Sequence, residues 1–327
     1  MGGNLFKLGR RPRGEYLEIE AEVRAVLDAL VGDGYRIPRY YASKPDFGDL
    51  DVVVSSAAID ALGGWEAFRT AITEGLGVTA SQSTGHVYST VVREFQVDYF
   101  VREADVFEAT ANYLAFNDVG NLLGKIYRRL GLKYGEHGLS YVFRRASRES
   151  YKRELPISRD WPRILALIGL DAAPWQAGFE TLEDAFAWVV TSPYFSIAPY
   201  EELAATPEHR AKLRTTMARF LDWLEAEGVD RRCDYLDDRT AYVPMIAAAF
   251  PEAELERALA DEHQREADAL VVRAKFGGEL VREWTGLDGK ALGAFLRRFA
   301  RAYPFEALLA MEPAAIRAAV ESFAREP

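Results

Sequence analysis

The spacing of the hydrophobic residues changes near residue 103, and this change limits the possible folds more than any other feature of the chain. Before it, short segments rich in Val, Tyr and Phe are separated by Gly, Pro, Ser and Asp, which is typical of β-strands. The strands predicted from these segments span 39–42, 50–55, 87–92 and 95–101. Helices are predicted at 16–31 and 65–76, where apolar residues recur every three or four positions. The first part of the chain should therefore combine helices with a small mixed sheet.

After residue 103 the helical spacing continues almost to the end of the chain. The segments that show it are 105–115, 117–130, 182–190, 209–227, 251–272 and 290–302. A length of 327 residues favours two domains. We predict an α+β protein with a mixed-sheet domain at 1–115, which includes the N-terminal helix, and a mainly α-helical domain at 116–327.

The composition excludes several classes of protein. With 49% hydrophobic and 28% charged residues, the chain has the composition of a globular protein. The single Cys233 cannot form an intrachain disulfide, and no apolar run approaches the ~20 residues that cross a bilayer. We therefore expect a reduced, cytoplasmic protein that does not contact membranes. The four histidines are far apart in the sequence, so a metal site would have to be built from carboxylates.

Charge is unevenly distributed along the chain. The formal net charge is -10, yet residues 121–163 contain eleven Lys and Arg against four Asp and Glu. Aromatic residues are interleaved with these bases: Tyr127, Tyr134, Tyr141, Phe143, Tyr151 and Trp161. This composition is expected where phosphates are neutralised and bases are stacked. The alternative is an amphipathic segment in which the aromatic rings are core and the basic side chains are solvated.

The residues that indicate chemistry begin at Ser43-Lys44 and continue through Gly48 into a predicted strand. Side chains alternate along a strand, so Asp49 and Asp51 should lie on one side of it and the apolar residues between and after them on the other. A further acid, Asp98, interrupts the apolar strand predicted at 95–101. Clustered carboxylates repel one another, so such a cluster usually persists because cations offset its charge.

Oxygen ligands without His or Cys suit Mg²⁺ or Mn²⁺, and two such ions can clamp both oxygens of an in-line phosphoryl displacement. The reaction class that this indicates is nucleotidyl transfer. An Asp-x-Asp pair at a strand start is also common for structural reasons, because Asp favours turns. The catalytic interpretation rests on the conjunction of Ser43-Lys44, the glycine at the bend and the acid on the second strand.

These residues resemble the nucleotidyltransferase superfamily typified by DNA polymerase β, CCA-adding enzymes and poly(A) polymerases. The resemblance implies that Asp49 and Asp51 hold both metals, that Asp98 completes the site, and that Ser43 and Lys44 face the phosphates of the nucleotide. One difference from the superfamily is that Ala42 stands where a Gly is usual, and Ser43 precedes Asp49 by only six positions.

A narrower resemblance involves the segments 116–125, 133–135 and 192–195, which are similar to nucleotidyltransferase-like proteins of large bacteriophages and some bacteria. The segment 286–293 is similar to the Gly-rich start of a helix in the helical tail of CCA-adding and poly(A) enzymes. An ordinary Gly-containing turn before a helix explains it equally well.

Asn117, Asn121 and Lys125 are spaced four residues apart, so all three would share one face of a predicted helix. There the amides would bind the base or sugar of a nucleotide and the lysine a phosphate. The alternative is that Asn117 and the residue after it cap the helix and that Lys125 is a surface residue. From the basic segment we expect Arg128, Arg129 and Lys133 to contact the phosphates of the acceptor.

The sequence therefore predicts a Mg²⁺-dependent (or Mn²⁺-dependent) nucleotidyltransferase that moves NMP from an NTP, such as ATP, to an RNA 3′ end of tRNA-like kind. One alternative is transfer to a small molecule or a protein hydroxyl, which the net negative charge favours. Another is a module that binds nucleotide or RNA without catalysis. The nucleotide preference, single addition or tailing, template use and the oligomeric state are not encoded in any feature of the sequence that we identified.

Overall fold

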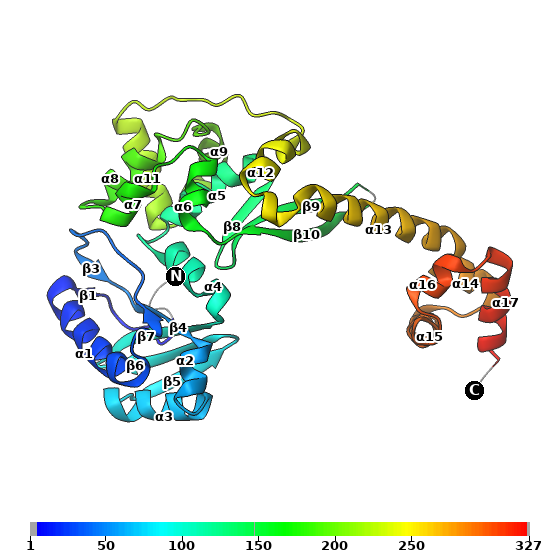
Figure 1. Cartoon of the computed structure of the whole chain (residues 1–327), viewed down its shortest axis with the longest axis horizontal. Helices are drawn as coiled ribbons and strands as arrows, with labels where there is room; N and C mark the ends of the chain where they lie inside the picture. The colour runs from blue at the N-terminus through cyan, green and yellow to red at the C-terminus, as the bar shows by residue number, and fades with distance from the viewer. Residues whose placement is uncertain (1–4, 147, 326–327) are drawn as a thin grey trace. The chain divides into compact units, whose positions relative to one another are not determined.

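The computed structural model describes residues 5–146 and 148–325, and Figure 1 shows its helices and strands. The chain forms two compact units. The first unit consists of Met1–Val142 and Glu154–Leu255, and the second of Phe143–Arg153 and Glu256–Pro327. Each unit is therefore built from two separate stretches of the chain.

A five-stranded mixed sheet in the order β2-β4-β7-β6-β5 organises the first half of the first unit. Its strands are β2 (Tyr35–Arg36), β4 (Leu50–Ser55), β5 (Ala80–Thr84), β6 (Val87–Val92) and β7 (Phe95–Arg102). The central strands β4 and β7 are parallel, and the other neighbours are antiparallel. A short antiparallel ribbon also joins β1 (Arg11–Pro12) to β3 (Asp46–Phe47).

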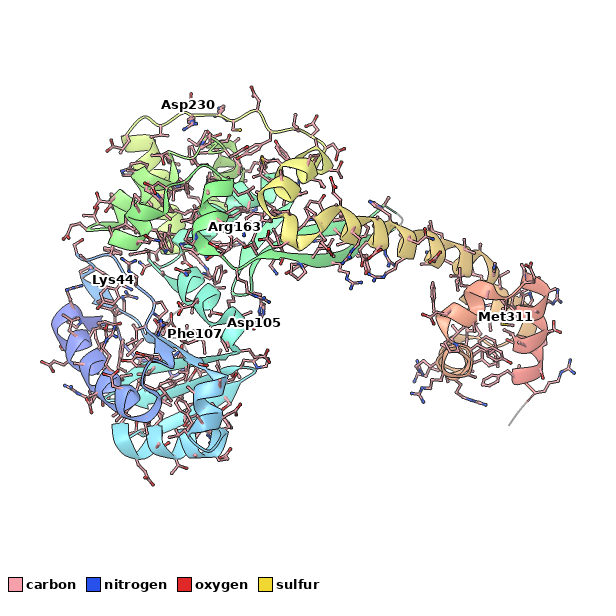
Figure 2. The ribbon with its side chains drawn as sticks, viewed as in Figure 1. Lys44, Asp105, Phe107, Arg163, Asp230 and Met311 are labelled. Carbon is pink, nitrogen blue, oxygen red and sulfur yellow. The ribbon has the colours of Figure 1, made fainter. Side chains whose placement is uncertain are left out.

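Helices cover both faces of this sheet. On one face α1 (Arg13–Val31) and α3 (Trp65–Leu76) pack against Leu50, Val52 and Val54 of β4, and α2 (Ser56–Ala61) follows that strand directly. On the other face, Val53 packs against Phe107 of α4 (Ala104–Leu114), which is labelled in Figure 2. Strand β4 is therefore apolar on its α1 face at every alternate position, as a two-residue side-chain period requires.

A second, three-stranded sheet in the order β10-β9-β8 lies later in the chain. Its strands are β8 (Leu132–Gly135), β9 (Gly138–Arg145) and β10 (Arg148–Ser158). The helices of the first unit beyond α4 are α5 (Val119–Arg129), α6 (Trp161–Leu167), α7 (Ala172–Ala177), α8 (Leu182–Val189), α9 (Ala198–Glu201), α10 (Pro207–Arg210), α11 (Thr215–Ala226) and α12 (Val243–Ala249). Short 3-10 turns lie at Glu202–Ala204, Arg239–Tyr242 and Pro251–Ala253.

The second unit is helical apart from residues 143–153, where β9 and β10 end and begin. Its helices are α13 (Leu255–Lys275), α14 (Gly278–Thr285), α15 (Gly289–Ala302), α16 (Phe305–Ala310) and α17 (Pro313–Phe323). The core of this unit includes Val281, Phe299 and Ile316, all fully buried. The strand ends pack on α13, where the Phe143 ring lies 5.1 Å from that of His263.

An ion pair connects the same two stretches of the second unit. The carboxylate of Glu262 on α13 is 0% exposed and lies 2.7 Å from the Arg153 guanidinium. Arg265 also contacts this carboxylate from the next turn of α13. A buried carboxylate between two partly exposed arginines thus fastens residues 143–153 to the helix.

The predicted fold class is confirmed: the protein is α+β, with a small mixed sheet followed by a mainly helical region. The strands predicted at 50–55, 87–92 and 95–101 and the helices predicted at 16–31 and 65–76 are present. The predicted boundary at residue 115 falls inside the first unit, between α4 and α5, and stays a prediction. Among the described residues, no helix combines the length and the apolar character that a membrane span needs.

One strand prediction needs correction, and several strands were not predicted. Residues 39–42 form no strand, because the backbone N–H of Ala42 donates to the Phe179 carbonyl in a loop contact 2.8 Å long. The exposed strand β5, the two-residue strands β1, β2 and β3, and the strands β8, β9 and β10 were not predicted. In β8 the alternation is short: Leu132 and Tyr134 are buried while Lys133 between them is exposed.

Two helix predictions also need correction. The helix predicted at 117–130 begins only at Val119, since Phe116 and Asn117 have φ angles of 54° and 61°. The helix predicted at 209–227 is interrupted between α10 and α11, where Arg214 is extended. Both interruptions lie beside the candidate site described next.

Candidate active site

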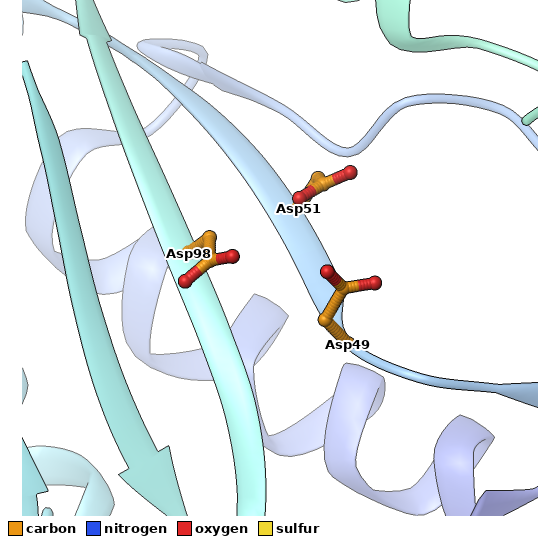
Figure 3. Close-up of side chains that lie close together, drawn as sticks. All are labelled: Asp49, Asp51 and Asp98. Atoms are coloured by element: carbon orange, nitrogen blue, oxygen red, sulfur yellow. The ribbon is translucent and has the colours of Figure 1, made fainter. Parts of the chain in front are cut away.

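Three carboxylates from the two parallel central strands form one cluster. Asp51 of β4 lies directly opposite Asp98 of β7 in the strand register, and Asp49 precedes β4 on the same side as Asp51. Carboxylate oxygens of the three residues all lie within 4.8 Å of one another. Figure 3 shows the carboxyl groups facing a common space from neighbouring strands. The prediction that Asp49, Asp51 and Asp98 meet is confirmed.

The cluster is electrostatically unfavourable in the absence of a cation. Burial raises the pKa of Asp51 well above its usual range, and the charges of Asp49 and Asp98 raise it further. Burial also raises the pKa of Asp98, while hydrogen bonds from Ser89 and Gln96 oppose that shift. A cation between the carboxylates would favour their ionised forms and offset the repulsion.

Gln96 fixes the orientation of Asp98. Its amide nitrogen donates to both carboxylate oxygens of Asp98, over 3.0 and 2.8 Å, and its side chain is only 3% exposed. Two residues apart on β7, the amide and the carboxylate lie on the same face of the sheet. Gln96 was not predicted from the sequence, although a polar residue inside an apolar strand, two positions from a candidate ligand, was a usable signal.

The loop of residues 43–49 leads to the carboxylates and is held at several points. The Ser43 N–H donates to the Glu180 carbonyl over 2.8 Å, and the Arg13 N–H donates to the Pro45 carbonyl over 2.9 Å. At Asp46 the loop forms an ion pair of 2.6 Å with Arg10. These contacts fix the backbone before Asp49, which favours a preorganised position for that carboxylate.

Lys44 lies within the same site, and its position is labelled in Figure 2. Its Nζ donates to Asn117 Oδ1 over 2.9 Å and lies 4.3 Å from the centre of the Phe47 ring. Burial lowers the pKa of Lys44 to about 8, although the charge of Asp49 acts in the opposite direction. A half-buried cation beside three carboxylates is suited to a phosphate that a divalent cation also contacts.

The partner of Lys44 has an unusual backbone. Asn117 and the preceding Phe116 both have left-handed φ angles, 61° and 54°, which are uncommon for residues other than glycine. Phe116 is held there because it is buried against Trp175 and Phe179 and its N–H donates to the Arg39 carbonyl over 2.5 Å. Backbone strain of this kind, about 1–3 kcal/mol per residue, concentrates at functional sites. Here it directs the Asn117 amide toward Lys44.

The carboxylates open into a cavity of about 1050 Å³, which we call the carboxylate cavity. Of the residues predicted to bind nucleotide, it is lined by Lys44, Gly48, Asn117 and Asn121. Ser43 is exposed and does not line it. Asn117 therefore reaches the site from the bend before α5, and not from the helix face on which the sequence analysis placed it.

A second cavity of about 630 Å³ lies along helix α5, and we call it the α5 cavity. It shares several lining residues with the carboxylate cavity, among them Tyr113, Asp118, Asn121 and Arg214. Lys125, Arg128 and Lys133 line only the α5 cavity. Arg129 lines neither cavity, because its guanidinium pairs with Glu202 over 2.5 Å.

Arg214 is a residue at both cavities that the sequence analysis did not identify. Its guanidinium lies 2.5 Å from Asp118, which also accepts a hydrogen bond of 2.8 Å from the Asn121 amide. The interruption between α10 and α11 brings Arg214 and Lys212 to both cavities. No Gly or Pro marks this interruption in residues 211–214, so the sequence carried no usual signal for it.

Part of the basic segment 121–163 has a structural role among the described residues. Five of its bases pair with carboxylates: Arg129 with Glu202, Lys133 with Glu154, Arg153 with Glu262, Arg159 with Asp105 and Arg163 with Glu252. The rings of Tyr127, Tyr134, Tyr141, Phe143 and Trp161 are buried. These rings are therefore core residues, and their interpretation as a stacking surface is wrong.

The donor set of the cluster fits a hard divalent cation. Carboxylate oxygens are the preferred ligands of Mg²⁺ and Mn²⁺, and three carboxylates supply enough charge to hold such an ion. Asp49, Asp51 and Asp98 are also the only group of three or more potential metal ligands that converge among the residues described here. A divalent metal site at this position is consistent with all three side chains.

Comparisons with known proteins add little to this geometry. The sequence matches no protein-family model and no curated protein. Among solved structures, a crystal structure of polymerase beta from Leishmania infantum in a ternary P/T complex matches 49% of this chain and 73% of its own. The identity is 16% and the TM-score 0.37. This similarity is too weak for an assignment, so the function has to be inferred from the site itself.

Proposed function

We propose that the protein is a metal-dependent nucleotidyltransferase, and one observation carries the proposal. Asp49, Asp51 and Asp98 converge within 4.8 Å at the wall of a cavity that also contains the half-buried Lys44. Carboxylates that hold divalent ions beside a lysine form a site for a polyphosphate and for an attacking hydroxyl. In this reaction the acceptor oxygen bonds to the α-phosphorus of an NTP and pyrophosphate leaves.

The residues of the chain have separate tasks in this reaction. Asp49, Asp51 and Asp98 would hold the divalent cation, which when bound lowers the pKa of the acceptor hydroxyl and neutralises charge on the phosphates. Gln96 keeps Asp98 in a single orientation through its two hydrogen bonds. Lys44 offers its ammonium group to a phosphate oxygen, and Asn117 holds Lys44 at the cavity through the 2.9 Å hydrogen bond. Gly48 and Asn121 complete the nucleotide-binding surface.

For the acceptor we propose an RNA 3′ end, supported by Lys125 and Arg128 in the cavity next to the carboxylates. The net charge of -10 and the ion-paired basic segment favour a small molecule or a protein hydroxyl as the second candidate. A module that binds nucleotide without catalysis is the less favoured reading, because binding alone does not require three converging carboxylates.

The test uses each α-labelled NTP with Mg²⁺, total RNA and the full chain. We expect the label to be transferred to an acceptor and pyrophosphate to be released. Asp49→Asn and Asp98→Asn should reduce the transfer at least 100-fold, whereas Asp60→Asn, which changes an exposed acid outside both cavities, should not. Transfer that persists in either cluster variant would disprove the proposal. Whether RNA, protein or a small molecule carries the label identifies the acceptor class.

A further inference from the structure

The α5 cavity contains cations without carboxylate partners. Its acids are already paired: Asp118 with Arg214, Glu154 with Lys133, both over 2.5 Å, and Glu136 with Arg102. For Lys125, Arg128 and Lys212, which also line the cavity, no carboxylate lies within ion-pair distance in the part of the chain that the structure describes. The cavity therefore presents three basic side chains that form no ion pair among the described residues.

The charges of Lys125 and Arg128 are close enough to interact, and Lys212 lines the same cavity. Lys125 is half-buried on α5, and the burial together with the positive charge of Arg128 lowers its pKa, although the charge of Glu202 acts in the opposite direction. Holding ammonium and guanidinium groups together costs free energy unless an anion is bound between them. The unpaired cations thus favour an anionic ligand in the cavity.

Helix α5 leaves room for such a ligand. Gly124 lies in the interior of the helix, where glycine destabilises by about 1 kcal/mol relative to alanine. A Cβ at this position would meet no atom within 4 Å, so packing against the protein does not explain the glycine. Gly124 lies one residue before Lys125 and one turn before Arg128, and all three line the cavity. The open helix surface and the cations therefore belong to one concave site.

The volume and position of the cavity limit its ligand. A space of about 630 Å³ suits a molecule of nucleotide size. Through Tyr113, Asp118, Asn121 and Arg214 it adjoins the carboxylate cavity, where Lys44 and the carboxylates already provide for the phosphates of the nucleotide. A ligand in the α5 cavity is then placed to extend toward the α-phosphorus as the attacking partner.

We propose that the α5 cavity binds a phosphate group of the acceptor, so that the acceptor is a phosphorylated molecule whose hydroxyl extends into the carboxylate cavity. This inference rests on the proposed nucleotidyl transfer. It makes Lys125 and Arg128 ligands of a phosphate group of the acceptor and adds Lys212 to them. Two kinds of acceptor fit this proposal: the last nucleotides of a strand and a small phosphorylated molecule. Both carry a phosphate beside a hydroxyl.

The test measures binding by isothermal titration calorimetry to the full chain in EDTA, so that no divalent cation contributes. The probes are adenosine 3′,5′-bisphosphate and adenosine, which differ only in their phosphates. We expect adenosine to bind at least tenfold more weakly than the bisphosphate. Gly124→Leu, which fills the cavity with a good helix former, should weaken bisphosphate binding at least tenfold, as should Lys125→Gln combined with Arg128→Gln.

Matched variants separate this site from general electrostatics and from misfolding. Arg297→Gln removes an exposed charge of α15 in the second unit and should change bisphosphate binding less than twofold. Gly124→Ala retains most of the cavity and should bind more tightly than Gly124→Leu. Equal binding of adenosine and the bisphosphate, or unchanged binding in Gly124→Leu, would overturn the inference.

Two further titrations identify the source of the phosphate. A tetraribonucleotide that binds at least tenfold more tightly than the bisphosphate indicates a strand end, and the opposite order indicates a small molecule. Either result supports the phosphate site. If Gly124→Leu weakens binding of ATP with Mg²⁺ by the same factor as binding of the bisphosphate, the cavity holds the phosphates of the nucleotide and the inference is wrong. Failure of the proposed function would appear separately, as absent transfer with intact bisphosphate binding.

Discussion

Replacing Asp51 by Asn should make the protein more stable without metal and unresponsive to metal. Asp51 is the residue of the cluster whose pKa is raised by burial and by both neighbouring carboxylates. Asparagine has nearly the same shape, so the change removes one negative charge and little packing. Substitution of a residue with a purely structural role would lower the stability of the protein. Substitution of a metal ligand, measured without metal, is expected to raise it.

The magnitude follows from the separation of the charges. Two unit charges 4.8 Å apart repel by about 3.5 kcal/mol at an effective dielectric constant of 20. Protonation of the cluster relieves part of this repulsion at neutral pH, so we expect a gain of about 1–2 kcal/mol in the free energy of unfolding. For a unit of this size that gain raises the Tm by about 2–8 °C.

A bound divalent cation should stabilise the wild-type protein more than the Asp51→Asn variant. At a concentration ten times its Kd, a divalent cation stabilises the native state by about 1.4 kcal/mol, equivalent to a Tm increase of about 3–6 °C. The Asp51→Asn variant should show less than a third of this increase, because a ligand of the ion has been removed.

Thermal unfolding of the full chain, followed by circular dichroism in EDTA, Mg²⁺ and Mn²⁺, measures both effects. Asp60→Asn is the control, since Asp60 is an exposed acid outside the cluster. The reasoning is refuted if Asp51→Asn lowers the Tm in EDTA, or if both divalent ions raise the Tm of the variant as much as that of the wild type.

Three further substitutions, one of them with a matched control, test other parts of the structure. Asn117→Gly retains the left-handed backbone but removes the acceptor for Lys44, so the KM for the NTP should rise several-fold at nearly unchanged Tm; an unchanged KM contradicts the assigned role. Gly169→Ala should cost at least about 2 kcal/mol in urea unfolding, since its Cβ would lie 2.5 Å from the Pro193 ring. Gly228→Ala, also at positive φ but in open space, should cost only about 1 kcal/mol, and equal losses would refute the steric argument. Glu262→Gln should destabilise the second unit by about 1–3 kcal/mol, which an unchanged urea midpoint would contradict.

The carboxylate cluster was predictable because it depends on local periodicity. An acid at every second position of β4 has to lie on one face, and the apolar residues between them determine which face is core. The pairing of Asp51 with Asp98 is a long-range register between parallel strands. Sequence spacing could indicate that these strands are present, while their neighbourhood in the sheet was available only through the family resemblance.

The surroundings of the cluster were less predictable, for physical reasons. Asn117 is aimed by a left-handed bend that burial of Phe116 maintains, and tertiary packing of this kind leaves no periodic signal. Arg214 reaches the cavities through a helix interruption without Gly or Pro. The excess of bases in residues 121–163 was misleading in a different way, because four of the five acids that neutralise them lie outside this segment.

The composite construction of the second unit has a consequence for biosynthesis. Residues 143–153 leave the ribosome about a hundred residues before α13, the helix that covers Phe143 and pairs with Arg153. At about 5–20 residues per second, that interval lasts on the order of 5–20 s. During this time residues 154–255 of the first unit are being synthesised, and the ends of β9 and β10 have to stay available with the Phe143 ring uncovered. A nascent chain halted before residue 256 would keep this surface exposed and open to chaperones or to association with another chain.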